Sequence, residues 1–344
     1  MFENFFNTKK PIIGVDIGHS SIKVAQVESR GKKTSLFAIS EISLETAPLQ
    51  KDGIHDKDAL VANIKKAIAS AKPKPIKSKK VGTSLPASLV FTKLVSLPNV
   101  KKIDLNNAVP QLAEDFLPVP IEEVVLDWQI INENTTTKTM DVLVIAAPKA
   151  LVSDLVLVFA AAGLELDFIE IKPISLARAL TNPSENSTTA LVDIGSDASG
   201  ISIIERGNVK ASSTIKFGAQ NIAKILSTNV KATTDSAITT IESDKSPQNQ
   251  AFSIDSLKPI TDEVTKLIKY YRSRMGAQEE VKEIRICGGG AELKGISNYF
   301  LSLTNTPAIL ANPLLNINLC PKELLSPNLL KFSVAIGLSL RQTK

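Results

Sequence analysis

Two stretches of this sequence share one pattern, and this repeat decides the fold. Residues Ile13–Glu28 read IGVDIGHSSIKVAQVE, and residues Ala190–Glu205 read ALVDIGSDASGISIIE. Each begins with a short apolar run, passes through Asp-Ile-Gly into a polar tip, and returns as a second apolar run. Such runs predict two strands joined by a tight turn. A charged segment with glycine and a third apolar run follow in both copies, so we infer two halves of one duplicated α/β architecture.

The Asp-Ile-Gly turns contain residue types that suit a phosphate-bearing ligand. Glycines such as Gly18 and Gly195 let backbone N–H groups approach an anion closely. Asp16 and Asp193 end the preceding strands, where a carboxylate suits a Mg²⁺ ion that bridges protein and phosphate. Two such turns facing each other across a cleft would hold a nucleoside triphosphate from both sides. Two unrelated hairpin turns are the alternative, because Asp and Gly are common in turns, but the matched pair disfavours it.

A third glycine cluster supports the nucleotide interpretation. Residues Glu283–Gly295 read EIRICGGGAELKG, which predicts a strand ending at Gly288, Gly289 and Gly290 and then the start of a helix. Glycines between a strand and a helix let the backbone pass close to a planar or phosphate-bearing ligand. The pattern is neither a dinucleotide fingerprint nor a Walker loop, so those two nucleotide-binding folds are not predicted.

Composition narrows the class of protein. The chain has 344 residues, of which 43% are hydrophobic and 22% are charged, and its net charge is +5. This length predicts two to three domains with a real core. Aromatic residues make up 5% of the chain, which leaves few stacking platforms for bases, so we expect no nucleic-acid partner. The two cysteines lack a disulfide or zinc spacing.

Hydropathy and the first residues predict where the protein works. The longest apolar stretch, Ala150–Leu164, contains Ser153 and Asp154 and is shorter than the roughly 20 residues of a membrane-spanning helix. The start, Met1–Lys10, lacks the order of charge, apolar core and small residues that a signal peptide has. We therefore expect a cytoplasmic protein that does not cross the membrane.

These motifs resemble those of the actin-like ATPase superfamily, which includes actin, Hsp70, sugar kinases and FtsA. The resemblance implies an actin-like, ribonuclease H-like duplicated fold with two halves around a cleft that binds ATP and Mg²⁺. Asp16 and Asp193 would serve the metal. The nucleotide-binding residues that it implies are Asp16, Gly18, His19, Ser20, Ser21 and Lys23 in the first phosphate loop, Asp193, Gly195, Ser196 and Asp197 in the second, and Glu263, Lys266, Gly288, Gly289 and Gly290 around adenosine.

Within this superfamily the chain is most similar to the PilM family of type IV pilus assembly proteins. The diagnostic part is an insertion at residues 87–165. Its predicted elements are a strand at 87–97, a helix capped by Asp104 and ending at Phe116, strands at 124–131 and 140–146, and a helix at 149–162. This β-α-β-β-α unit resembles the 1C subdomain of the FtsA and PilM branch.

The resemblance also implies the domain boundaries. The first half would comprise residues 1–86 and 166–188, and the second half residues 189–332. Residues 333–344 would form a C-terminal helix that returns to the first half, with small Ala335 and Gly337 allowing a close helix crossing. Outside the motifs, Phe2, Phe5 and Phe6 offer a small apolar face for packing or docking, and residues 228–258 are polar.

The function that the resemblance implies is a part in type IV pilus assembly at the membrane. PilM proteins capture the N-terminal cytoplasmic segment of the membrane protein PilN between the first subdomain and 1C, and through PilN they connect to PilO and the pilus motor. The resemblance implies the same partners here, a peripheral position at the inner membrane through them, and a possible homo-oligomer. Which residues contact PilN does not follow from the motifs.

One position departs from the hydrolysing relatives and leaves the enzymatic status open. Where Hsp70 and MreB have a glutamate before the proline of the first connecting helix, this chain has Lys172, with Glu170 two residues earlier. A charged lysine cannot accept a proton from the attacking water. We therefore expect weak or absent ATPase activity. Alternatives from other classes are a sugar or acid kinase, an FtsA-like filament-forming protein, and a peptide-binding protein that needs no nucleotide.

Overall fold

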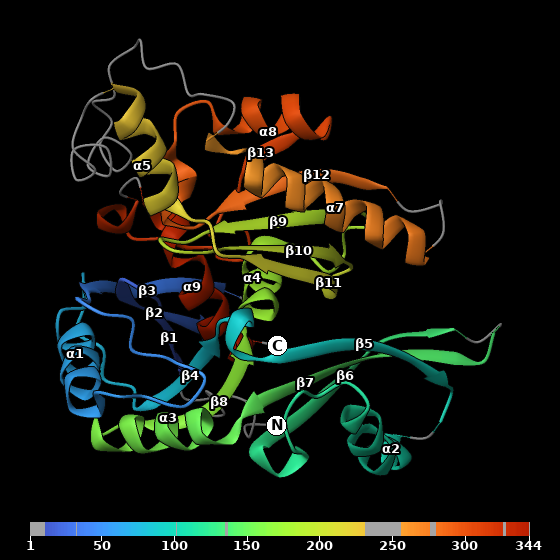
Figure 1. Cartoon of the computed structure of the whole chain (residues 1–344). Helices are drawn as coiled ribbons and strands as arrows, with labels where there is room; N and C mark the ends of the chain where they lie inside the picture. The colour runs from blue at the N-terminus through green and yellow to red at the C-terminus, as the bar shows by residue number, and fades with distance from the viewer. Residues whose placement is uncertain are drawn as a thin grey trace.

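Two five-stranded sheets of the same topology form the two halves of the molecule (Figure 1). The computed structural model describes residues 11–31, 33–100, 102–134, 137–230, 256–275, 280–325 and 328–343. The first sheet has the order β3 (Lys33–Ser43), β2 (Ser21–Arg30), β1 (Ile13–Ile17), β4 (Lys80–Leu85) and β8 (Glu165–Ile171). The second has the order β11 (Asn208–Ile215), β10 (Ser199–Glu205), β9 (Thr188–Ile194), β12 (Val281–Cys287) and β13 (Ala308–Leu310).

Strand pairing repeats from one sheet to the other. The first three strands of each half, β1 to β3 and β9 to β11, pair antiparallel. The remaining two strands of each half then join in parallel beside β1 or β9. The predicted duplicated α/β fold is therefore confirmed.

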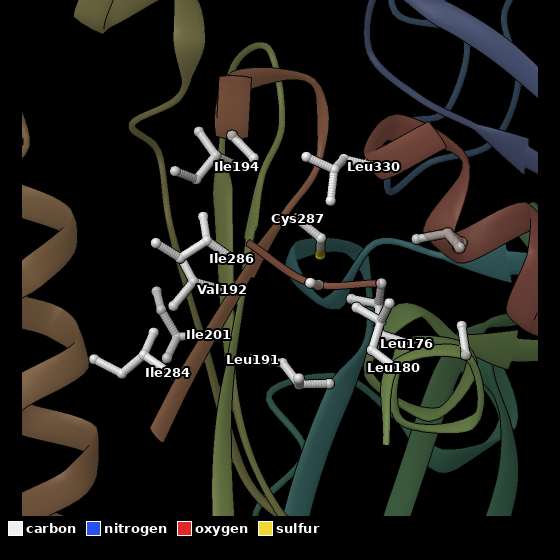
Figure 2. Close-up of a cluster of buried hydrophobic side chains, with 14 of the residues drawn as sticks. Leu176, Leu180, Leu191, Val192, Ile194, Ile201, Ile284, Ile286, Cys287 and Leu330 are labelled. Atoms are coloured by element: carbon white, nitrogen blue, oxygen red, sulfur yellow. The ribbon is translucent and has the colours of Figure 1, made fainter. Parts of the chain in front are cut away.

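The central strands are apolar because helices cover them on both faces. The helices of the two halves are α1 (Lys57–Ala69), α3 (Lys149–Ala161), α4 (Lys172–Leu180), α5 (Ala219–Val230), α7 (Lys258–Met275), α8 (Ile296–Thr304) and α9 (Ser333–Ser339). Leu176 and Leu180 of α4 join the buried cluster of the second sheet, which includes Leu191, Ile284 and Ile286 (Figure 2). The first sheet has a separate core with α1 and α3.

Two short helices, α4 and α9, lie between the two halves and contact each other (Figure 1). A Cβ atom added at Gly337 of α9 would lie 2.0 Å from the backbone oxygen of Ser175 in α4. A Cβ atom added at Gly14 of β1 would lie 1.9 Å from the oxygen of Ala335. Only glycine allows such close backbone approaches. The C-terminal helix α9 thus packs against both β1 and α4, as its small residues suggested.

The insertion forms a third sheet with its own core. The strand order is β5 (Phe91–Pro98), β7 (Thr139–Pro148) and β6 (Val124–Asn134), all antiparallel, and α2 (Lys102–Glu114) packs on it. The helix α3 follows in sequence, but its buried side chains, including Leu151 and Phe159, belong to the core of the first sheet. The proposed domain boundaries at residues 87 and 165 stay a prediction.

Local details differ from the sequence-based expectation in three places. Residues 87–89 form a short 3₁₀ helix, so β5 begins only at Phe91. Helix α2 begins at Lys102, so Asp104 lies in its first turn, where a carboxylate favours the helix dipole, rather than at the cap. After Gly288, residues 289–292 form a 3₁₀ turn, and the left-handed Gly295 precedes α8, so no helix starts directly after the glycine cluster.

Two sequence-based expectations fall partly or wholly on residues outside the described ranges. Phe2, Phe5 and Phe6 lie there, as does most of the polar stretch at 228–258. In the part of the chain that is described, no helix combines the length and apolar character needed to cross a membrane.

Candidate functional site

A cleft of about 970 Å³ brings the sequence motifs of the two halves together. Both Asp-Ile-Gly turns line it, as do the glycine cluster, Lys172 at the start of α4, and residues just before α9 and in its first turn. The predicted site residues that line this cleft are Asp16, Gly18, His19, Ser20, Ser21, Lys23, Asp193, Gly195, Ser196, Asp197, Gly288, Gly289 and Gly290.

The two turns share one backbone geometry. The N–H of Gly18 donates to the carbonyl of Ser21 at 2.9 Å, and the N–H of Gly195 donates to the carbonyl of Ala198 at 3.0 Å. A Cβ atom added at either glycine would lie 3.0 Å or 2.8 Å from that same carbonyl oxygen. Each turn therefore needs its glycine for the same steric reason, which agrees with the repeated sequence pattern of the two halves.

The second turn is held by the start of α5, a contact that the motifs did not predict. The N–H of Ala219 donates to the carbonyl of Gly195 at 2.8 Å, and the N–H of Gln220 donates to that of Ser196 at 2.9 Å. Ala219 and Gln220 also line the cleft. The first turn of a helix thus fixes the loop that faces the cleft.

The glycine cluster packs against the end of β9. Gly288 has φ +87°, and a Cβ atom there would lie 2.5 Å from both Asp193 Oδ1 and the Ile194 carbonyl oxygen. A Cβ atom at Gly290 would lie 2.4 Å from the Ile194 side chain. At Gly289 it would meet no atom within 4 Å. Gly288 and Gly290 are therefore required by packing, while Gly289 leaves open space beside the cleft.

Lys172 is the cation at the base of the cleft. Its Nζ lies 2.8 Å from Asp16 Oδ1, and the two side chains are 19% and 6% exposed. Burial by itself would lower the pKa of Lys172, but the charges of Asp16 and Asp193 raise it above its ordinary value. The pKa of Asp193 is raised by burial and by the charge of Asp16, against the opposing effect of Lys172. Because the pKa of Lys172 is raised, its ammonium is charged at neutral pH.

Glu170 does not face the cleft. Its carboxylate accepts two hydrogen bonds from Arg178, at 2.7 and 2.9 Å, and Arg341 approaches at 3.4 Å. This bidentate pair joins the end of β8 to α4 and engages both carboxylate oxygens of Glu170. Glu170 is thus a structural ion-pair partner that does not line the cleft, and only the structure shows this, because side chains two residues apart on a strand would share a face.

A second group of charges lies beside the first turn. Lys23 Nζ donates to Ser21 Oγ at 2.6 Å and lies 3.6 Å from Glu41 Oε1, while Lys331 pairs with the other oxygen of Glu41. Burial alone would raise the pKa of Glu41, but Lys331 and Lys23 together lower it. Lys331 was missed at the sequence level, because a lone lysine before a helix carries no motif.

His19 and Asp197 meet across the cleft. His19 Nδ1 of the first turn lies 3.9 Å from Asp197 Oδ2 of the second, and both side chains are partly exposed. Since the two turns come from different halves, this contact joins the halves at the lining of the cleft.

Glu263 and Lys266 are the predicted site residues that do not line the cleft. Lys266 is 77% exposed and lies 3.4 Å from Glu263. Glu263 accepts a hydrogen bond from Ser213 Oγ at 2.5 Å, and Ser213 does line the cleft. Glu263 reaches the cleft only through this serine, so the described geometry gives the pair no direct position against a ligand.

Solved structures with the actin-like ATPase fold align with this chain over nearly its whole length. The ethanolamine utilization protein EutJ from Carboxydothermus hydrogenoformans aligns with a TM-score of 0.56 and 14% identity, over 99% of this chain and 93% of that chain. MreB 5 of Spiroplasma citri, solved bound to AMPPNP, aligns with a TM-score of 0.52 and 16% identity, over 97% of each chain. At this identity the likeness is one of fold.

The chain belongs to the PilM family, because the profile of "Type IV pilus assembly protein PilM" matches residues 14–343. A chain in a solved PilM–PilN type IV pilus biogenesis complex aligns with a TM-score of 0.79 and 21% identity, over 97% of this chain and 99% of that chain. Family membership and fold agree with the resemblance drawn from the motifs.

Cell division proteins are related at lower coverage. FtsA of Bacillus subtilis is 24% identical over 259 residues, which are 67% of this chain and 57% of that protein. FtsA of Streptococcus pneumoniae is 25% identical over 245 residues, 63% of this chain and 53% of that protein. The chain spans just over half the length of these curated relatives.

Proposed function

We propose that this protein binds ATP in the cleft between its halves and, in that form, captures the N-terminal cytoplasmic segment of PilN during type IV pilus assembly. The observation that carries the nucleotide part is the pair of Gly-turns with one shared hydrogen-bond geometry facing a single cleft. Turns with exposed backbone N–H groups suit phosphate oxygens. The AMPPNP-bound MreB 5 of S. citri, which has the same fold, supports this choice of ligand.

Each part of the cleft has a proposed role toward ATP. Gly18, His19, Ser20, Ser21 and Lys23 of the first turn and Gly195, Ser196 and Asp197 of the second would surround the phosphates. The cluster of Gly288, Gly289 and Gly290 would lie along adenosine. Lysines lining the same cleft supply positive charge, and charged donors make the stronger hydrogen bonds to phosphate oxygens.

The Mg²⁺ ion expected with ATP fits these residues poorly. Its proposed ligands are Asp16 and Asp193, but Asp16 is already held by the Lys172 ammonium at 2.8 Å. Among the described residues, no group of three or more His, Cys, Asp or Glu side chains could hold a metal ion. We therefore assign no step of the proposed function to a metal on Asp16.

We expect little ATP turnover. Lys172 stands at the position of the water-orienting glutamate of hydrolysing relatives, and Glu170 is committed to Arg178. A charged ammonium cannot act as a general base. ATP would then act as a ligand that stabilises the folded protein by mass action. Phosphate release measured on purified protein tests this: turnover typical of enzymes that is unaffected by Lys172→Ala would overturn it.

A steric variant tests the nucleotide site. Gly195→Ala places a Cβ atom 2.8 Å from the Ala198 carbonyl oxygen and distorts the second turn. Gly200→Ala is the matched control, because Gly200 lines the same cleft and its added Cβ meets no atom within 4 Å. In titrations with a fluorescent ATP analogue, we expect Gly195→Ala to weaken binding at least about tenfold and Gly200→Ala to change it less than about threefold. Equal effects would argue against the turn as a phosphate loop.

For PilN, the family and the chain aligned in the PilM–PilN complex support the proposal. The inserted sheet offers two edge strands, β5 and β6, and an extended peptide gains main-chain hydrogen bonds at such an edge. PilN would hold the protein at the cytoplasmic face of the inner membrane and connect it to PilO and the motor.

A titration of a peptide with the PilN N-terminal sequence, with and without ATP, tests this partner. If the two ligands are coupled, each must change the affinity of the other by the same factor. Absence of peptide binding under both conditions would overturn the PilN assignment. The FtsA relatives favour a second candidate, a filament-forming protein, which ATP-dependent pelleting at high protein concentration would reveal.

A further inference from the structure

The base of the cleft contains a cation that belongs to the chain itself. Lys172 opens α4, its side chain is only 19% exposed, and its Nζ lies 2.8 Å from Asp16 Oδ1. Asp193, at the corresponding point of the other half, acts electrostatically on the same ammonium. One lysine is thus paired with a carboxylate of the first half and within the electrostatic influence of a carboxylate of the second half.

A divalent ion bound directly to Asp16 would compete with this lysine. Mg²⁺ binds carboxylate oxygens at about 2.0–2.1 Å, so an ion on Asp16 Oδ1 would lie within a few ångströms of the ammonium already placed there. Two positive groups so close in a partly buried site repel each other strongly. A metal on that oxygen would displace Lys172 from Asp16, which would cost the ion pair.

The lysine is also available to a ligand. It lines the cleft together with both turns, and its ammonium has three N–H donors, while its contact with Asp16 Oδ1 is an ion pair. Its remaining donors can reach an anion in the cleft. By contrast, Arg178 at the other end of α4 is committed to Glu170 and to the carbonyl of Gly337, away from the cleft lining. Of the two cations of this helix, Arg178 therefore holds elements of the fold together and Lys172 lines the cleft.

We propose that Lys172 is the resident cation of this cleft: its ammonium takes the place on Asp16 that a divalent metal would need, so nucleotide phosphates bind without a divalent ion. This inference rests on the proposed nucleotide-binding function. Lys23 and Lys331, which share Glu41, add further positive charge to the same cleft. The ligand class is a nucleoside phosphate in its metal-free form.

The first test needs no nucleotide. Thermal unfolding is followed with and without millimolar magnesium chloride, at constant ionic strength, for the wild type, Lys172→Gln and Lys216→Gln. Lys216 is the matched control, because it is an exposed lysine that lines the same cleft. We expect Mg²⁺ to leave the Tm of the wild type and of Lys216→Gln within about 1 °C. We expect Lys172→Gln to have a lower Tm than the wild type. Mg²⁺ should raise this Tm, because the ion then neutralises the carboxylate charges of Asp16 and Asp193.

Two outcomes of this test would overturn the inference. One is a Tm of the wild type that Mg²⁺ raises as much as it raises that of Lys172→Gln. The other is a folded Lys172→Gln variant that does not respond to Mg²⁺. If Lys172→Gln fails to fold, the double variant Asp16→Asn/Lys172→Gln removes both charges of the pair and should fold without any response to Mg²⁺; a response there also counts against the inference.

The second test separates this inference from the proposed function. A fluorescent ATP analogue is titrated into the wild type in EDTA and in Mg²⁺. We expect the two dissociation constants to agree within about threefold, and Lys172→Gln to bind at least about tenfold more weakly in EDTA than in Mg²⁺. If the wild type bound the ATP analogue only in Mg²⁺, the role of Lys172 as resident cation would be overturned, while the proposed nucleotide function would stand. Absence of binding in both solutions would overturn the proposed nucleotide function and, with it, this inference.

Discussion

Gly288 and Gly289 are neighbours in sequence, but only Gly288 has a backbone that an alanine would strain. Its φ of +87° lies in a region that L-residues rarely adopt, and an added Cβ atom would lie 2.5 Å from Asp193 Oδ1 and from the Ile194 oxygen. Gly289 has open space around its Cβ position. One glycine therefore shapes the end of β9, including the carboxylate that faces Lys172, and the next one does not.

We predict that Gly288→Ala lowers the free energy of unfolding by about 1–3 kcal/mol, since the residue is strained and crowded. Gly289→Ala should change it by less than about 0.5 kcal/mol. Urea denaturation of both variants measures the difference. Comparable losses in the two variants would contradict a role for Gly288 in supporting β9.

At the scale of elements, the crossing of α4 and α9 decides where Lys172 lies. Gly337 of α9 lets the backbone of Ser175 approach, and Arg178 ties α4 to Glu170 at the end of β8. Because Lys172 is the first residue of α4, any shift of this helix moves the ammonium relative to Asp16. Helix packing and the electrostatics of the cleft are thus coupled.

We predict that Gly337→Ala, whose Cβ atom would lie 2.0 Å from the Ser175 oxygen, destabilises the fold by about 1–3 kcal/mol or more, as overpacked cores do. It should also weaken binding of an ATP analogue. Gly200→Ala, which meets no atom within 4 Å, is the control in both the denaturation and the binding assay. Unchanged stability together with unchanged binding would show that α4 and α9 can separate freely.

At the scale of the whole molecule, Glu41 connects parts that are far apart in sequence. It lies on β3 of the first sheet and pairs with Lys331, which lies just before α9. Burial opposes the charged form of Glu41, but Lys331 and Lys23 lower its pKa below the ordinary value of 4.5. A carboxyl with a depressed folded-state pKa stabilises the protein at pH values above its unfolded-state pKa.

This stabilisation should be lost as the pH falls below about 4.5 and through the lower pKa of the folded state. We predict that Glu41→Gln lowers the Tm at pH 6–7 but has progressively less effect as the solution becomes more acidic. Thermal unfolding from pH 3 to pH 7 measures the difference between the two proteins. A difference that is constant over this range would contradict a stabilising ion-pair role for Glu41.

The sequence by itself determined the duplicated architecture, the two turns and the order of elements in the insertion. These features depend on local pattern: Asp16-Ile17-Gly18 and Asp193-Ile194-Gly195 each end an apolar run, and period and turn residues are readable from neighbours in the chain. Most of the predicted cleft residues follow from the same motifs. The boundaries of β5 and α2 were less well predicted, because caps and short 3₁₀ segments depend on small local energies.

Only the tertiary structure decided which side chains meet. From the sequence, Lys172 predicts only that a general base is missing, whereas the fold places its ammonium 2.8 Å from Asp16 Oδ1. Lys331 enters the cleft without any motif, Glu263 and Lys266 lie outside the lining, and α3 packs in the core of the first half. The reason is physical: ion pairs and packing join residues more than a hundred positions apart, and their geometry depends on how whole helices cross, which no local pattern encodes.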